Sequence, residues 1–131
     1  MSEQKSPIIF TDEFLNGLQE LPKQSPRLRA NFDLRNSPED NSQRILNIMD
    51  KGTVVPIHCH PDTSESVVIL RGAIDWIFYD ENNKEIAGYK LSRENGPYGL
   101  QIPAGQLHGI EVQESGSIVF EAKDGKYIPN R

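Results

Sequence analysis

Residues 52–72 read GTVVPIHCHPDTSESVVILRG and hold two of the chain's three histidines, its single cysteine and a glutamate. Side chains alternate along a strand, so a strand over residues 53–60 places His58 and His60 on one face, where two imidazoles reach one point. Cys59 then faces the opposite way. We expect Cys59 to be a buried packing residue and not a metal ligand, which is the usual role of a free cysteine.

A carboxylate and the third histidine complete a candidate metal site. Glu65 opens the next expected strand after the turn PDTS, and His108 follows the tight turn of IPAGQLHG, residues 102–109. Three imidazoles and one carboxylate suit Zn, Fe(II), Mn, Co or Ni and disfavour Ca. The sequence therefore predicts one divalent transition metal per chain, held by His58, His60, Glu65 and His108. The alternative interpretation of the His-x-His pair is a partly exposed polar strand.

Short strands dominate the rest of the chain. In LRANFDLR, residues 28–35, apolar residues recur at every second position. Further strands are expected at residues 44–50, 53–60, 66–70, 73–79, 85–91, 100–102, 108–112 and 117–122. Many short strands separated by Gly, Pro and Asn are typical of an antiparallel sandwich or jelly roll. The sequence predicts an all-β fold.

One short helix is expected near the N-terminus. Thr11 can cap it, and two acidic residues follow in its first turn, as the helix dipole favours. Pro22 ends the run. The apolar residues of this helix fall on one face and are expected to close one end of the core; they are Phe14, Leu15, Leu18 and Leu21.

The histidine segments resemble the two sequence motifs of the cupin superfamily. Gly52, His58-x-His60, Glu65 and Gly72 have the spacing of the first motif. Pro103-x-Gly105-x-x-His108 resembles the core of the second motif, with Pro97 and Val112 standing where the family usually has glycine and asparagine. The resemblance implies a double-stranded β-helix whose metal ligands lie inside the barrel, with residues 1–26 as an extension carrying the short helix and residues 27–131 as the barrel domain.

Three further segments resemble the small WbuC-type cupin metalloproteins, which occur with O-antigen and other surface-polysaccharide genes. These segments are SPRLRANFDLR from Ser25, NSQRILNIM from Asn41 and VFEAKDGKYIPN, which ends at Asn130. Arg35 stands where that family tends to have histidine, and Lys126 where it tends to have proline. The resemblance implies a fold and a metal but no assigned reaction. It links the ligand to a sugar or a sugar-related metabolite.

Basic residues near the first strands suggest a site for a small anion. Guanidinium groups can bind a carboxylate or phosphate through two hydrogen bonds. A solvated outer strand face is the alternative interpretation of the same residues. In the C-terminal motif, Glu121 and Tyr127 are further candidates for roles beside the metal. The candidate ligand-binding residues are Arg27, Arg29, Arg35, Arg44 and Tyr127.

Composition and charge limit the kinds of partner and the compartment that we expect for this protein. The net charge of −5 and the scattered basic residues give no phosphate-tracking stripe, so we expect no nucleic-acid binding. The longest apolar run, residues 67–70, is far shorter than a membrane span. The N-terminus lacks the pattern of a signal peptide, and a single cysteine fits a reducing compartment, so we expect a cytoplasmic protein. Exposed edge strands favour a homodimer.

Three functions are compatible with the sequence. The first is a metal-dependent enzyme acting on a small polar molecule, with isomerase and oxygenase chemistry unresolved. The second is a module that binds or senses a small anionic ligand without turnover. The third is a closed structural zinc site, in which four protein ligands complete a tetrahedral shell.

Overall fold

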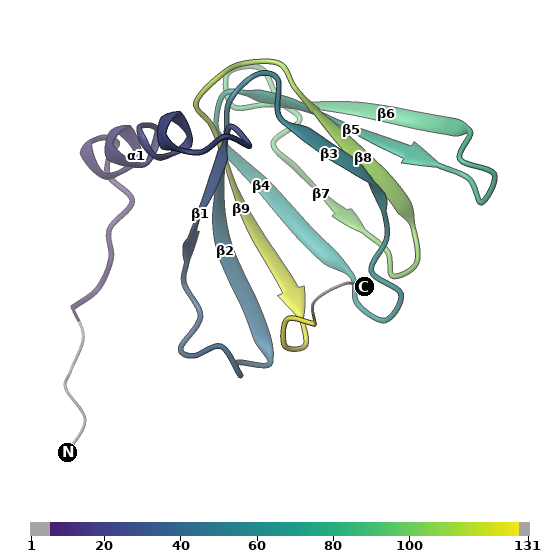
Figure 1. The fold of residues 1–131 in the computed structure, drawn as a ribbon, viewed down its shortest axis with the longest axis horizontal. Coiled ribbons are helices and arrows are strands. Elements are labelled where there is room, and N and C mark those ends of the chain that lie inside the picture. The colour runs from purple at the N-terminus through teal and green to yellow at the C-terminus, as the bar shows by residue number, and fades with distance from the viewer. Residues whose placement is uncertain (1–5, 129–131) are drawn as a thin grey trace.

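Two antiparallel sheets face each other and form the body of the molecule (Figure 1). The structure, a computed structural model, describes residues 6–128. The outer ends of the expected segments 1–26 and 27–131, and Asn130 of the C-terminal resemblance, lie outside the described residues. The all-β fold with a short N-terminal helix, predicted from the strand pattern, is confirmed.

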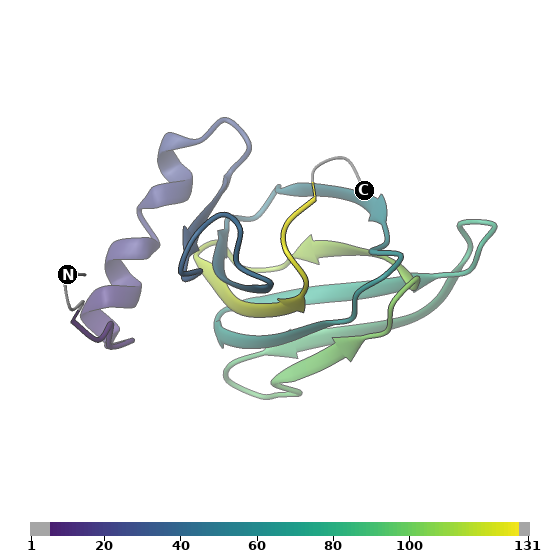
Figure 2. The same ribbon diagram turned by 90° about the horizontal axis from the view of Figure 1, so that it is seen from below.

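The strands are divided unequally between the sheets. The five-stranded sheet contains, in order, β1 (Arg29–Asp33), β2 (Ser42–Met49), β9 (Ser117–Asp124), β4 (Glu65–Arg71) and β7 (Gly99–Ile102). The four-stranded sheet contains β3 (Val54–His58), β8 (Leu107–Val112), β5 (Ala73–Tyr79) and β6 (Glu85–Ser92). The β5–β6 hairpin extends away from the rest of the molecule, opposite the N-terminal helix (Figures 1 and 2).

The main core fills the space between the two sheets. Trp76 is its largest side chain and is 2% exposed. Side chains alternate along each strand, so every second residue of a strand reaches this core. The buried members of this core are Met49, Val67, Ile69, Ile74, Trp76, Leu91, Ile102, Val112 and Val119.

A second core lies between the five-stranded sheet and the helix α1 (Asp12–Leu18), which is followed by the 3-10 helix η1 (Leu21–Gln24). Thr11 caps α1 as expected, since its Oγ1 accepts from the backbone N–H of Phe14 over 3.0 Å. The buried side chains of this second core are Leu15, Leu18, Leu46, Ile48 and Ile118. The five-stranded sheet is thus covered on both faces.

Polar contacts reinforce the attachment of α1. The guanidinium group of Arg71, at the end of β4, donates hydrogen bonds to Asn16 and Gln19 and pairs with Asp12. Gln19 in turn donates to the carbonyl of Gly116, in the turn before β9. In two perpendicular views α1 lies at the side of the sandwich that carries β1 (Figures 1 and 2). The helix is therefore packed against the barrel.

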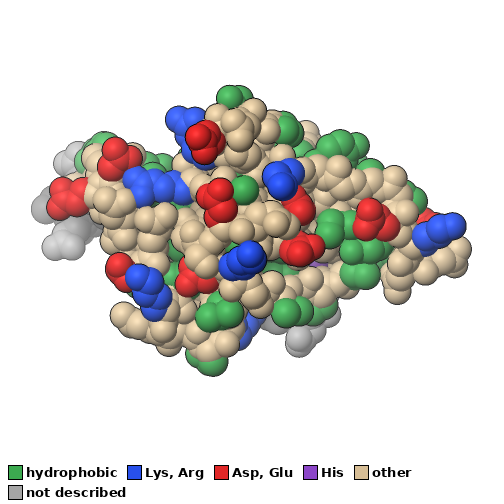
Figure 3. Space-filling view, turned by 90° about the horizontal axis from the view of Figure 1, so that it is seen from above, with side chains coloured by type: hydrophobic (Ala, Val, Ile, Leu, Met, Phe, Trp, Pro, Cys, Tyr) green, Lys and Arg blue, Asp and Glu red, His purple; other side chains and the backbone are tan. Residues whose placement is uncertain are grey.

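Acidic and basic side chains are mixed on the surface. On the face drawn in Figure 3, basic and acidic side chains are interspersed, with hydrophobic side chains between them. Within residues 6–128, no helix has the length and apolar character that a membrane span requires.

Candidate metal centre

His58 and His108 meet because β3 and β8 pair directly. His58 is the last residue of β3 and stands opposite His108 in the register, with ring centroids 4.4 Å apart. The register shifts between Val55 and His58, which marks a β-bulge. Val55 pairs with Ile110, and both of these side chains line the same cavity as the histidines. The bulge thus lets Val55 and His58 face inward although three positions separate them.

His60 lies in the loop between β3 and β4, and Glu65 begins β4. His60 lies two residues beyond the end of β3, and Glu65 is the first residue of β4 and only 5% exposed. Nε2 of His60 lies 3.2 Å from Oε2 of Glu65. The backbone N–H of Gly105 donates to the carbonyl of His60 over 2.9 Å. This bond ties the turn that precedes His108 to the segment that carries His60.

The three imidazoles and the carboxylate of Glu65 lie close together. The ligand atoms of His58, His60 and His108 all lie within 4.8 Å of one another. Ligands bound about 2.1 Å from one ion stand roughly 3.0–3.5 Å apart, for angles between octahedral and tetrahedral. The 3.2 Å between His60 and Glu65 falls in that range. The structure therefore brings together all four residues that the sequence proposed as ligands.

Backbone carbonyls orient two of the imidazoles. Nδ1 of His58 lies 2.8 Å from the carbonyl oxygen of Pro56, and Nδ1 of His108 lies 2.9 Å from that of Gln106. A carbonyl oxygen only accepts, so in each contact Nδ1 carries the proton and donates. The lone pair of each ring is then on Nε2, and this arrangement is typical of histidines that bind a metal.

The charges at the site also suit a cation. Burial raises the pKa of the Glu65 carboxyl, but the hydrogen bond with His60 and the positive charge of Lys123 outweigh this and hold the pKa below its usual value. Burial lowers the pKa of His108, and the nearby charge of His58 lowers it further. The pair therefore favours a carboxylate and a neutral imidazole, which are the forms that bind a metal ion.

A cavity of about 100 Å³ contains these groups and two polar residues besides them, Asn47 and Glu121. Nδ2 of Asn47 donates to Oε2 of Glu121 over 2.6 Å. Burial and the negative charge of Glu65 raise the pKa of Glu121 to about 8. Sequence reasoning named Glu121 only as a candidate and missed Asn47. An acidic residue within the apolar run of β9 was the signal available.

The arginines proposed as ligand-binding residues lie outside the metal cavity. Arg35 donates two side-chain hydrogen bonds to Asp33, and Arg44 pairs with Asp40 over 3.1 Å. Arg29 begins β1, and Arg27 lies in the preceding turn. None of the described residues that line the metal cavity, or the larger cavity beside it, is an arginine.

Tyr127, the other proposed ligand-binding residue, does line that larger neighbouring cavity.

The burial of Cys59 differs from the prediction. The prediction of a buried cysteine is wrong, because Cys59 is half-buried. The strand ends at His58, so strand alternation no longer governs the residues beyond it.

Solved structures share this fold. CapF from Staphylococcus aureus superposes with a TM-score of 0.66 at 24% identity, over 79% of this chain and 30% of CapF. KdgF from Halomonas sp. gives 0.61 at 18% identity, over 79% and 85% of the two chains. Oxalate decarboxylase from Bacillus subtilis gives 0.59 at 17% identity, over 78% and 26%. The chain thus spans about a third of the length of CapF.

These neighbours are cupin-fold proteins, so the fold and the histidine cluster define a cupin-fold protein with a candidate metal site. Residues 10–91 match the model of the family described as a domain of unknown function, DUF6016, and the chain belongs to that family. None of the curated proteins compared with the chain matches it.

Proposed function

We propose that this protein is a metal-dependent cupin that binds one divalent transition metal and acts on a small polar or anionic molecule. One observation carries the proposal: three imidazoles and a buried carboxylate converge on one point inside the barrel, within 4.8 Å for the imidazoles and 3.2 Å for the His60–Glu65 pair. The ligands would be His58, His60, Glu65 and His108. A bound ion would supply a Lewis-acid or redox centre at that point.

The surroundings favour an open site over a closed structural zinc site. A structural zinc ion needs four ligands and no further polar groups. Here the cavity also holds the carboxyl of Glu121 and the amide of Asn47, and His60 additionally borders a second cavity. Six-coordinate ions such as Fe(II), Mn, Co and Ni would keep two positions for a ligand beside four protein groups.

The substrate class rests on resemblance. CapF from Staphylococcus aureus is described as a capsular polysaccharide assembling protein, and it shares this fold at 24% identity. The WbuC-type segments, from Ser25 to Asn130, point in the same direction. We therefore propose a WbuC-type cupin that acts in surface-polysaccharide metabolism on a sugar or a sugar-related metabolite, as a cytoplasmic homodimer. Sedimentation of the purified protein as a monomer would contradict the dimer.

Elemental analysis by mass spectrometry of untagged protein tests the metal. We expect about one transition-metal ion per chain in the wild type and loss of that ion in a His58→Ala, His108→Ala double variant. Glu111→Gln is the matched control, because Glu111 lies on β8 like His108 but is exposed. Wild-type protein that holds no metal after each ion is added back would overturn the proposal.

The identity of the bound ion distinguishes an open site from a closed structural site. Fe, Mn, Co or Ni would agree with an open site. Zinc would agree with it only if X-ray absorption spectroscopy of the zinc protein showed a water ligand or a fifth ligand. Four protein ligands alone around zinc would favour the structural alternative.

A further inference from the structure

A second cavity, of about 220 Å³, lies beside the metal cavity and shares His60 with it. We call it the mouth pocket. Its walls come from the loop after β3, the inner face of the five-stranded sheet and the segment that follows β9. The residues that line it are Gln43, His60, Pro61, Asp62, Thr63, Lys123, Lys126, Tyr127 and Ile128. Its volume is below the range of roughly 300–1,000 Å³ that is usual for drug-sized ligands, so it suits a smaller molecule.

Gln43 contributes an acceptor that lacks a partner. The side chain is 5% exposed, and its Nε2 donates to the carbonyl of Gly125 over 3.0 Å. This bond fixes the amide, because a carbonyl requires the NH₂ group to face it. Among the described residues, Oε1 of Gln43 is the buried side-chain oxygen without a hydrogen-bond partner. Buried polar atoms are nearly always paired, so this oxygen indicates a site for a donor from outside the chain.

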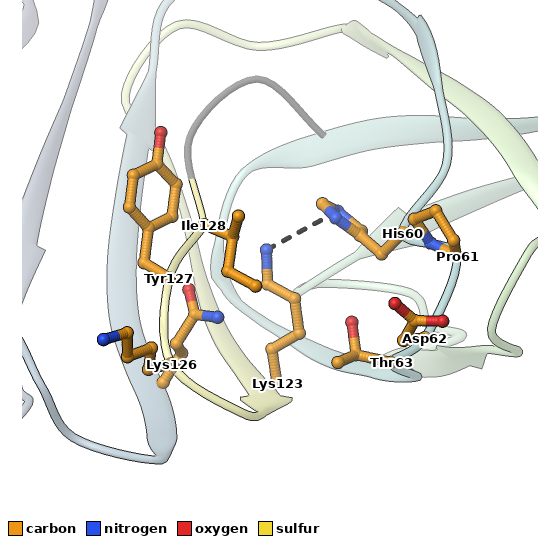
Figure 4. A pocket seen from close by; sticks show the side chains of 9 residues that line it. His60, Pro61, Asp62, Thr63, Lys123, Lys126, Tyr127 and Ile128 are labelled. Atoms are coloured by element: carbon orange, nitrogen blue, oxygen red, sulfur yellow. Dashed lines mark hydrogen bonds between the residues drawn. The ribbon is translucent and has the colours of Figure 1, made fainter.

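Lys123 contributes a cation at the inner end of the same pocket. Its ammonium group lies 3.5 Å from Nε2 of His60 and points toward that ring (Figure 4). In the register of the five-stranded sheet, Lys123 pairs with both Gln43 and Glu65. If His60 binds a metal through Nε2, this nitrogen is no longer an acceptor for the ammonium. Lys123 then keeps its charge interactions with the carboxyls of Glu65 and Glu121, and an anion in the pocket would supply a hydrogen-bond acceptor in place of His60.

The other walls leave room for a carbon skeleton. Figure 4 shows the two sides of the pocket: Lys126, Tyr127 and Ile128 on one side, and Pro61, Asp62 and Thr63 on the other. Lys126 is paired with Glu39 over 2.7 Å, and Asp62 also has an interaction within the chain. The half-exposed ring of Tyr127 offers an apolar surface beside the polar groups.

We propose that the mouth pocket binds a small hydroxylated anion. Its carboxylate or phosphate would accept from Nζ of Lys123, and one of its hydroxyl groups would donate to Oε1 of Gln43. Lys123 only donates and Oε1 of Gln43 only accepts, so the ligand must carry an anionic group and a donor together. A sugar acid, a hydroxy acid or a sugar phosphate meets this requirement, whereas a neutral sugar or a simple carboxylate meets half of it. The inference rests on the proposed function, because His60 joins this pocket to the metal site.

Calorimetric titration of the metal-loaded, full-length protein tests the inference. The probes are D-glucuronate, glucose 6-phosphate, neutral glucose, and acetate, which lacks hydroxyl groups. We expect the wild type to bind one of the two hydroxylated anions at least about tenfold more tightly than glucose and acetate. Preference for glucuronate would identify a carboxylate ligand, and preference for glucose 6-phosphate a phosphate ligand.

Two variants assign the contacts. Lys123→Met should weaken binding of the preferred anion by roughly 10- to 100-fold, because a charged hydrogen bond is lost. Gln43→Met should weaken it by about tenfold and reduce the preference over acetate. Lys84→Met is the matched control, since Lys84 is exposed in the turn between β5 and β6 and should leave binding unchanged.

Two results would overturn the inference. One is wild-type protein that binds neither hydroxylated anion at about 10 mM. The other is a folded Lys123→Met protein that binds the anion as the wild type does, which keeps the test decisive even if Gln43→Met does not fold. Metal content is measured on every sample. Absence of metal in the wild type would contradict the proposed function, whereas normal metal content without anion binding would contradict this inference alone.

Discussion

The imidazole rings of His58 and His108 lie 4.4 Å apart on directly paired residues of β3 and β8. Each ring directs Nδ1 to the carbonyl two residues earlier in its own chain segment. The two Nε2 atoms are therefore free to share one ion.

Metal binding should stabilise the fold through these rings. A metal at a free concentration about 100 times its Kd adds about 2.7 kcal/mol, which raises the Tm by about 10 °C for a domain of this size. His108→Ala should lose most of this shift, because a ligand is removed. Thermal unfolding with and without added metal, and after chelation, measures it. An equal shift in the variant would mean that the ion binds elsewhere.

The Asn47–Glu121 hydrogen bond should stabilise the barrel interior. Asn47→Leu leaves the carboxyl of Glu121 without its donor, so we expect a loss of about 1–3 kcal/mol in the free energy of unfolding. Because the two side chains form one unit, an Asn47→Leu, Glu121→Leu double variant should lose less than the sum of the single variants. Urea denaturation measures all three. Strict additivity would show that the two residues contribute separately.

The N-terminal helix should contribute to the stability of the barrel. Leu15 is 7% exposed and packs with Leu46, Ile48 and Ile118. Leu15→Ala should lower the free energy of unfolding by about 2–3 kcal/mol, because it leaves a cavity in the second core. Ile9→Ala is the control, since Ile9 is 65% exposed and should change stability little. Equal stability of the two variants would show that α1 is dispensable.

Two glycines should respond differently to alanine. Gly72 and Gly105 both have positive φ, 82° and 83°. A Cβ at Gly72 would lie 2.9 Å from Cα of Ser117, whereas a Cβ at Gly105 would meet nothing within 4 Å. Gly72→Ala should therefore cost about 3–5 kcal/mol, from strain and overpacking together, and Gly105→Ala about 1–2 kcal/mol from strain alone. Chemical denaturation compares them, and equal losses would contradict the role given to Ser117.

Acid stability should depend in part on Asp33. Hydrogen bonds from the side chain and backbone of Arg35 lower the pKa of Asp33 to about 2, from 3.8. A lowered carboxyl pKa contributes stability that is present above about pH 4 and is lost as the pH falls through about 2. Asp33→Asn should therefore lose less stability over that interval than the wild type. The difference should be small, because Asp33 is exposed and salt screens its pairing with Arg35.

Urea denaturation at about pH 4.5 and about pH 2.5, at low and high salt, measures this difference. Asp124→Asn is a suitable comparison, because Asp124 is another exposed carboxylate, at the far end of β9. Identical pH dependence in the wild type and Asp33→Asn would show that the ion pair contributes nothing measurable.

Sequence reasoning succeeded where spacing along the chain controls geometry. The cap at Thr11, the start of β4 at Glu65 and the strand that carries His108 all lie where the sequence predicted them. Each depends on local chemistry, namely a side-chain cap, a turn of known composition and a Pro-Gly turn. The spacing of the histidines and Glu65 predicted a set of residues that the structure brings together.

Strand alternation was less informative for β9. Its residues 118–120 are apolar at every position, because one face of the five-stranded sheet packs on α1 and the other on the second sheet. A strand covered on both faces shows no polar face, so the sequence cannot tell which residues point into the barrel. Alternation places Val119, Glu121 and Lys123 on one face of β9, and only the pairing of β9 with β2 and β4 showed that this face is the inner one.

The sequence by itself determined the fold class, the short helix and the residues proposed as metal ligands, since these depend on periodicity and on spacing along the chain. Only the tertiary structure decided that a bulge turns His58 inward, that Asn47 and Glu121 line the metal cavity, and that Gln43 and Lys123 meet in the mouth pocket. The physical reason is that periodicity determines which side chains share a face of a strand. Which face becomes the interior depends on the register between strands distant in the sequence.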